Sequence, residues 1–169
     1  RINSMEGFWW KGNLEGVSLE ERSLGDIKIK LTPVSLIKGR FGFNLDMIGP
    51  DLELKGIVGF TLNGNTYFEN TNVTLNPKLK VQSGKVVFQN VSNIQANIKS
   101  LYFNDVKCIS ADGTGTGEMI NVFGLLPQKL QINLKLDCKD DLFEVSFQSN
   151  PNNMLEGEVL IKPNLEFNL

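Results

Sequence analysis

Histidine is absent from this chain of 169 residues. Because histidine is the side chain that most often acts as a general base near neutral pH, its absence excludes Ser-His-Asp and Cys-His catalysis. Two cysteines are also too few soft ligands for a usual zinc site. No set of residues supplies a nucleophile, a base and an orienting group, so we expect a protein that is not an enzyme and holds no cofactor or metal.

An excess of positive charge is missing as well. The chain has 17 Lys and Arg against 19 Asp and Glu, and its lysines are spread thinly. A protein that binds nucleic acid usually gathers basic residues on one face, so we expect no nucleic-acid partner.

Long apolar runs do not occur. No stretch approaches the ~20 residues that span a bilayer, and the chain does not open with a charged and then an apolar signal segment. It begins at Arg1. We therefore expect a soluble fragment, or a processed chain whose targeting segment is absent.

Alternation of apolar and polar residues runs through the whole chain. The clearest run is "LQINLKLDC" at 130–138, because side chains two apart lie on one face of a strand. Turn signals built from Gly, Asn and Pro separate such runs about every ten residues, which is the rhythm of an antiparallel meander. They stand at 48–51, 62–66, 82–85 and 149–153. The pattern predicts a single all-β domain over residues 1–169.

Three segments stand out from this rhythm. "TPVSLIKG" at 32–39 has Thr32 as a possible N-cap, Pro33 at the first helical position and Gly39 as a stop, which predicts one or two helical turns. Residues 118–129 fit either a short helix or a loop that covers one end of the sheet. "DGTGTGE" at 112–118 lacks the glycine spacing of a dinucleotide loop and predicts a glycine-rich strand that a neighbouring segment approaches closely.

The adjacent residues Trp9 and Trp10 are the chain's two tryptophans. Neighbouring residues of a strand point to opposite faces, so we expect one ring in the core and the other on the outer face or under a neighbouring segment. A carbohydrate-binding platform needs its rings together. Trp9, Trp10, Tyr67 and Tyr102 are too dispersed in the sequence to favour that function.

Cys108 and Cys138 both lie in alternating, strand-like sequence. A disulfide between them closes a loop of about 30 residues, worth roughly 3 to 4 kcal/mol in the loop-entropy model. Two unpaired buried thiols fit the spacing equally well, so the spacing leaves both states open.

Several short motifs, taken in order, resemble the periplasmic part of the type II secretion system protein N family. The family's G-x-x-W-x-G opening is matched by Gly7, Trp10 and Gly12. Its L-x-P-x-x-L-L-x-G turn is matched around Pro33 and Gly39. A late pair of cysteines and an L-x-G-x-x-x-x-x-P finish follow, here Cys108, Cys138 and the segment 155–163.

The resemblance implies a curved antiparallel sheet, open like a trough and similar to the AsmA and TamB group. It implies an accessory, non-enzymatic role in type II secretion, with inner-membrane platform proteins of that system as partners. The chain would face the periplasm, held by an N-terminal membrane helix outside this sequence. That oxidising compartment favours the Cys108–Cys138 disulfide.

A trough of this kind has an apolar concave face that is either filled by its own side chains or holds a lipid. The alternative function is therefore a lipid-binding or lipid-bridging protein. The residues predicted for such an apolar groove are Phe41, Phe43, Leu45, Leu134, Leu136, Phe143 and Val145.

Overall fold

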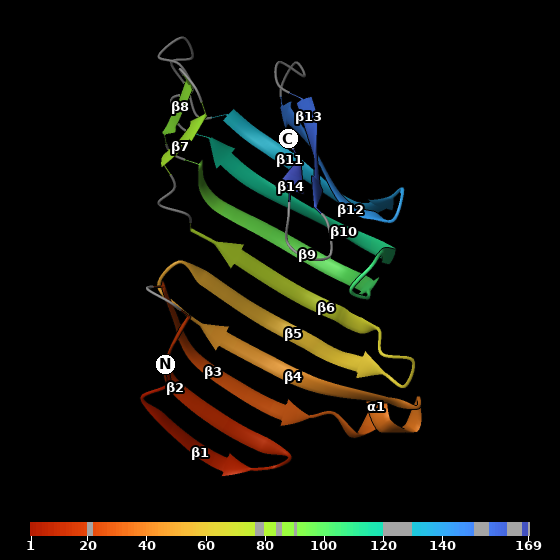
Figure 1. Cartoon of the computed structure of the whole chain (residues 1–169). Coiled ribbons are helices and arrows are strands. Elements are labelled where there is room, and N and C mark those ends of the chain that lie inside the picture. Colours follow the sequence, from red (N-terminus) through yellow and green to blue (C-terminus); the bar gives the residue numbers. More distant parts are fainter. Residues whose placement is uncertain are drawn as a thin grey trace.

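One antiparallel sheet of twelve strands makes up most of the molecule in the computed structural model (Figure 1). The structure describes residues 1–19, 22–76, 80–83, 86–89, 91–119, 130–150, 156–161 and 167–168. The elements are β1 (Ser4–Phe8), β2 (Lys11–Leu19), β3 (Arg22–Leu31), α1 (Pro33–Ile37), β4 (Arg40–Ile48), β5 (Leu52–Thr61), β6 (Thr66–Leu75), β7 (Lys80–Ser83), β8 (Val86–Gln89), β9 (Val91–Phe103), β10 (Cys108–Met119), β11 (Leu130–Lys139), β12 (Leu142–Asn150), β13 (Glu156–Ile161) and β14 (Phe167–Asn168). The predicted all-β class is confirmed.

The strands follow one another in the sheet almost as they do in the chain. Their order is β1 to β6, then β9 to β14, with β7 and β8 forming a separate hairpin between them. β1 and β14 stand at the two ends of this order, so the sheet is not closed into a barrel. The predicted meander with open edges is therefore confirmed.

The short helix α1 bridges β3 and β4 where the sequence predicts it. Thr32 stands at its N-cap and Pro33 at its start, although the Thr32 side chain makes no capping hydrogen bond. Gly39 follows the helix with a φ of +69°, a conformation that glycine adopts without strain.

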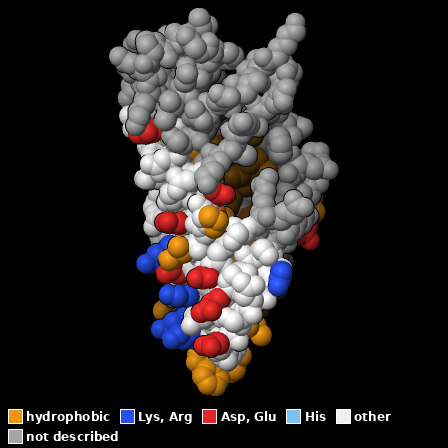
Figure 2. Space-filling model, turned by 90° about the vertical axis from the view of Figure 1, so that its left-hand side faces the viewer, with side chains coloured by type: hydrophobic (Ala, Val, Ile, Leu, Met, Phe, Trp, Pro, Cys, Tyr) orange, Lys and Arg blue, Asp and Glu red, His pale blue; other side chains and the backbone are white. Residues whose placement is uncertain are grey.

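The register separates the side chains onto two faces. A row of apolar partners crosses five strands through Leu31, Phe43, Val58, Phe68 and Leu101, and we call this side the apolar face. A polar row crosses nine strands on the other side, the polar face: Lys28, Asp46, Lys55, Asn72, Asn97, Thr114, Lys135, Ser146 and Glu158. Figure 2 looks along the strands and shows hydrophobic side chains inside the hollow of the bent sheet.

Few side chains are fully covered in this single layer. Among the described residues the buried apolar side chains are those of Met47, Tyr67, Cys108, Ile132 and Leu136. Most other residues of the apolar face are half-buried. None of the helices within the described ranges has the length and apolarity needed to cross a membrane.

The prediction that Trp9 and Trp10 lie in a strand is wrong. They form the two-residue turn between β1 and β2, whose last paired residues are Phe8 and Lys11. Their side chains are 79% and 46% exposed. In a turn, neighbouring side chains do not have to point to opposite faces of the sheet, and here neither ring enters a core.

Residues 118–129 are described only at their start, where Glu118 and Met119 end β10. The predicted helix or loop over the rest of this segment lies outside the described residues, as do the tips of the predicted turns at 82–85 and 149–153.

Candidate functional site: two faces and an aromatic turn

The residues predicted to line an apolar groove all lie on strands of the large sheet, in two groups. Phe41, Phe43 and Leu45 belong to β4. Leu134 and Leu136 of β11 lie beside Phe143 and Val145 of β12, where Leu136 and Val145 are direct partners. Four strands, β5, β6, β9 and β10, separate the two groups. The structure therefore brings together the β11 and β12 residues but keeps the β4 residues apart from them.

Exposure differs along this set. Leu136 is only 7% exposed, whereas Phe41, near the end of its strand, is 51% exposed. The remaining five are half-buried. The described side chains thus leave much of the apolar face accessible.

The glycines of β10 allow close packing between β10 and β11. Gly113 is paired with Leu136 and Gly115 with Leu134. A Cβ at position 113 would lie 2.8 Å from Leu136 Cδ1, so a larger residue has no room there. The predicted glycine-rich strand is confirmed. The Leu136 side chain and the Asn97 carbonyl occupy the space at Gly113, and the Gln95 carbonyl occupies it at Gly115.

A disulfide joins Cys108 at the start of β10 to Cys138 in β11, with their Cα atoms 5.7 Å apart. The amide of Cys108 also donates a hydrogen bond to the carbonyl of Asp141 in the β11–β12 turn, at 2.6 Å. The disulfide implied by the resemblance is therefore present and joins β10 to β11, and the hydrogen bond to Asp141 ties β10 to the turn that leads into β12.

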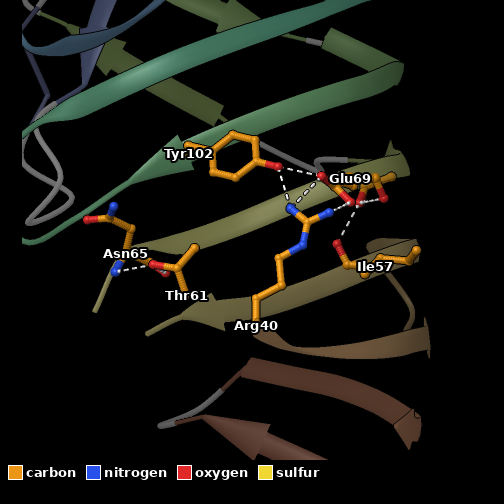
Figure 3. A network of polar contacts seen from close by, with 7 residues as sticks. Arg40, Ile57, Thr61, Asn65, Glu69 and Tyr102 are labelled. Atoms are coloured by element: carbon orange, nitrogen blue, oxygen red, sulfur yellow. Dashed lines mark hydrogen bonds and ion pairs between the residues drawn. The ribbon is translucent and has the colours of Figure 1, made fainter. Parts of the chain in front are cut away.

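The polar face carries a cluster that connects three strands (Figure 3). Arg40 of β4 contacts Glu69 of β6 through Nη1 at 2.8 Å from Oε1 and through Nη2 at 3.0 Å from Oε2. Arg40 Nη1 also donates to Tyr102 Oη of β9 at 2.6 Å, and the Tyr102 hydroxyl donates to Glu69. All three polar groups are therefore engaged with one another.

Tyr67 lies beneath this cluster and is completely buried. Its cross-strand row runs through Gly42, Gly59 and Tyr102. A Cβ at position 42 would collide with Ser35 Oγ of α1 and with Tyr67 Oη. The two glycines thus leave the space that the tyrosine ring fills, as aromatic residues often do beside glycine in sheets.

Two further contacts cover the Tyr67 ring. The Arg40 guanidinium carbon lies 4.6 Å from its centroid, and the Tyr102 ring stacks on it at 5.7 Å. A cation over an aromatic face and offset ring pairs are both attractive. The cluster holds α1, β4, β6 and β9 in one arrangement.

The pKa values in the cluster follow from its contacts. Partial burial disfavours the charged form of Glu69, but hydrogen bonds from Tyr102 and Arg40 outweigh it and hold the pKa of Glu69 below its ordinary value. Partial burial and the hydrogen bond to Glu69 raise the pKa of Tyr102. Glu69 therefore stays ionised and Tyr102 stays protonated at neutral pH, so neither is poised to transfer a proton.

The turn between β1 and β2 presents a second aromatic group. The Phe8 and Trp10 rings stack with centroids 5.1 Å apart, and Trp9 meets Trp10 edge-on at 5.2 Å. Beside them is a hollow of about 400 Å³ whose apolar walls include Met5, Leu14 and Ile29. The two tryptophans and the two tyrosines form separate pairs, because β3, β4 and β5 lie between them, and Tyr67 is completely buried.

In the comparison with protein-family models, the chain matches "Type II secretion system (T2SS), protein N" over residues 1–169. This chain belongs to the type II secretion system protein N family. No curated protein and no solved structure matches it. The family assignment confirms the resemblance inferred from the short motifs and identifies the chain as a component of a protein-secretion system.

The motif residues of this protein N chain lie at turns and at tight backbone contacts. Gly7 and Gly12 are direct partners in β1 and β2, and a Cβ at Gly7 would collide with the Lys11 carbonyl. Trp10 is in the adjacent turn, and its carbonyl accepts a hydrogen bond from Leu31 at 2.8 Å. Pro33 starts α1. The motif thus builds one corner of the sheet.

The Arg40, Glu69 and Tyr102 cluster is not predicted from the sequence. Their separation in sequence hides the contact, because it depends on the registers of four strands. A usable signal did exist: Gly42 and Gly59 interrupt two otherwise well-filled strands, and isolated strand glycines often mark a close approach.

Proposed function

We propose that this protein is an accessory, non-enzymatic component of type II secretion that acts in the periplasm. In this proposal an N-terminal membrane helix holds it at the inner membrane, where it contacts the platform proteins of the system. Membership of the protein N family supports the secretion role. The Cys108–Cys138 disulfide supports an oxidising compartment.

The observation that carries the proposal is the open edge of the sheet. β1 pairs with β2 on one side and stands at the end of the strand order, so its other side has no strand beside it among the described residues. An unpaired edge offers backbone donors and acceptors to an extended segment of another chain. A non-catalytic assembly protein can bind a partner in this way.

A photo-activated cross-linker tests this edge in the native envelope. Placed at Glu6 in β1, it is expected to capture a platform protein of the secretion system. The matched control is Glu53 in β5, which is also exposed but lies within the interior of the sheet order. Absence of any platform protein in the Glu6 product, together with normal secretion after deletion of the gene, contradicts the proposal.

A second function is favoured by the accessibility of the apolar face. Its described side chains are mostly half-buried, and the same face continues from β3 to β12. A lipid-binding or lipid-bridging trough, similar in architecture to the AsmA and TamB group, would place acyl chains there. Native mass spectrometry of protein extracted from membranes tests this function, and the absence of any copurified lipid contradicts it.

A further inference from the structure

Many of the exposed large hydrophobic side chains in the described part of the chain lie at one end of the strands. Eleven of the fourteen in the described residues lie in, or within two residues of, the connections at this end. These connections are the β1–β2 turn, α1, the β5–β6 turn and the β9–β10 turn, which follow the right-hand edge of Figure 1. The acidic β11–β12 turn, formed by Asp140 and Asp141, lies at the same end and carries none of the eleven. The most exposed in each are Trp9, Ile37, Leu62 and Val106, at 79%, 86%, 75% and 80%. Together with Trp10 we call these residues the apolar rim.

At the opposite end of the strands, fewer of the connections belong to the described residues. Ile2 and Ile48 are the exposed large hydrophobic side chains near that end in the described part of the chain. Figure 2 faces this end and shows acidic and basic side chains intermingled there. At the β1–β2 turn the exposed Phe8, Trp9 and Trp10 rings touch one another, and contiguous apolar exposure usually marks a binding surface.

The charges beside three of the four rim connections have one sign, whereas Asp105 and Lys107 flank Val106 in the β9–β10 turn. The segments 8–11, 30–40 and 60–65 contain Lys11, Lys30, Lys38 and Arg40 and no Asp or Glu. Lys11 and Lys30 are direct cross-strand partners, an arrangement that is unfavourable for like charges. Within the described residues no ion pair joins either lysine to a carboxylate. An anionic surface would relieve this repulsion.

We propose that the apolar rim docks onto the surface of a phospholipid bilayer that carries anionic headgroups. Tryptophan suits this position because its ring is apolar and its N–H is polar, which is why it is enriched at membrane interfaces. Lys11 and Lys30 meet the headgroup phosphates. The rim consists of separate tips from four connections. Fluid lipid fills the gaps between such tips, whereas the surface of a folded protein would need a complementary shape. The proposal is independent of the secretion partner and of lipid inside the trough.

The experiment uses the chain's own fluorescence, because both of its tryptophans belong to the rim. Vesicles of phosphatidylcholine with phosphatidylglycerol are expected to shift the emission to shorter wavelength, and brominated lipids to quench it. Co-sedimentation gives the vesicle affinity. Trp9→Ser with Trp10→Ser is expected to lower that affinity about tenfold or more, because two exposed rings no longer leave water.

Matched variants distinguish binding through the apolar rim from nonspecific hydrophobic adsorption. Ile37→Ser is expected to lower affinity several-fold, whereas Ile48→Ser, which is 58% exposed at the other end, leaves it unchanged. Lys11→Gln with Lys30→Gln weakens binding to anionic vesicles only. All of these residues are exposed, and circular dichroism checks that each variant is folded.

Three outcomes overturn the proposal. The folded protein shows neither an emission shift nor co-sedimentation at low salt. Ile48→Ser lowers binding as much as Ile37→Ser. Solubilised envelope proteins shift the emission while vesicles do not, which identifies a protein as the occupant of the rim.

Discussion

The two faces of the sheet differ most clearly at two adjacent residues of β6. Tyr67, on the polar face, is completely buried. Phe68, on the apolar face, stays half-buried and stacks on Phe103 at 6.1 Å. The difference arises from what covers each ring. Tyr67 lies under α1, Arg40 and Tyr102, whereas Phe68 has no second layer over it among the described residues. In a single-layer sheet, the burial of a side chain depends more on what packs over it than on its hydrophobicity.

Replacing these two rings gives the largest expected effect. Tyr67→Ala leaves a cavity between α1 and two glycines and is expected to lower the free energy of unfolding by about 3 to 5 kcal/mol. Phe68→Ala removes a ring that is already partly in water and should cost less than half as much. Chemical denaturation followed by circular dichroism measures both. If Phe68→Ala costs as much as Tyr67→Ala, the apolar face is the principal core and the comparison is wrong.

The disulfide tests how far β10 and β11 depend on a covalent link. Because it closes a loop of about 30 residues, Cys108→Ser with Cys138→Ser is expected to cost about 3 kcal/mol. Denaturation of the oxidised protein against this variant measures the loss. Reducing agent should destabilise the natural protein and leave the variant unchanged, and any effect on the variant would point to another cause.

The glycines beneath Tyr67 give a smaller effect. Gly42→Ala pushes a methyl group into Ser35 and Tyr67 and is expected to cost about 1 to 3 kcal/mol through overpacking. Gly12→Ala is the control, because the nearest atom to its Cβ is the Glu6 carbonyl oxygen at 3.7 Å. That variant should stay within about 0.5 kcal/mol of the natural protein. Thermal denaturation distinguishes them, and equal effects would mean that α1 does not press on this site.

The pH dependence of stability gives the smallest effect. The pKa of Glu69 is lowered in the folded state, so its contribution is present above the ordinary value of 4.5 and is lost as pH falls through the lower folded value. The loss is about 1 kcal/mol for a partly exposed pair. Glu69→Gln should reduce the fall in the free energy of unfolding that the natural protein shows below pH 4.5, as measured by chemical denaturation at a series of pH values. An unchanged slope would show that Glu69 does not couple to folding.

Local patterns in the sequence predicted much of this structure. Alternation predicted the strands and the apolar face, and Thr32, Pro33 and Gly39 predicted α1. The short motifs predicted the family. These features depend on residues that are close together in the sequence, so they do not depend on how distant segments pack.

The missed features depend on register or on a turn. Trp9 and Trp10 are predicted in a strand, but the pairing of Phe8 with Lys11 leaves them as the two residues of the turn. The Arg40–Glu69–Tyr102 cluster joins residues 29 and 62 positions away from Arg40. The alignment of four strands brings them together, and no single segment carries that information.

The amino-acid sequence by itself determined the strand periodicity, the two-sided character of the sheet and the exclusion of histidine-based catalysis. The tertiary structure decided which residues are covered and which turns share an end. The physical reason is that the alternation of a strand relates residues two apart in the chain. Which side chains are covered, and which turns lie together, depends on all the cross-strand registers between distant segments.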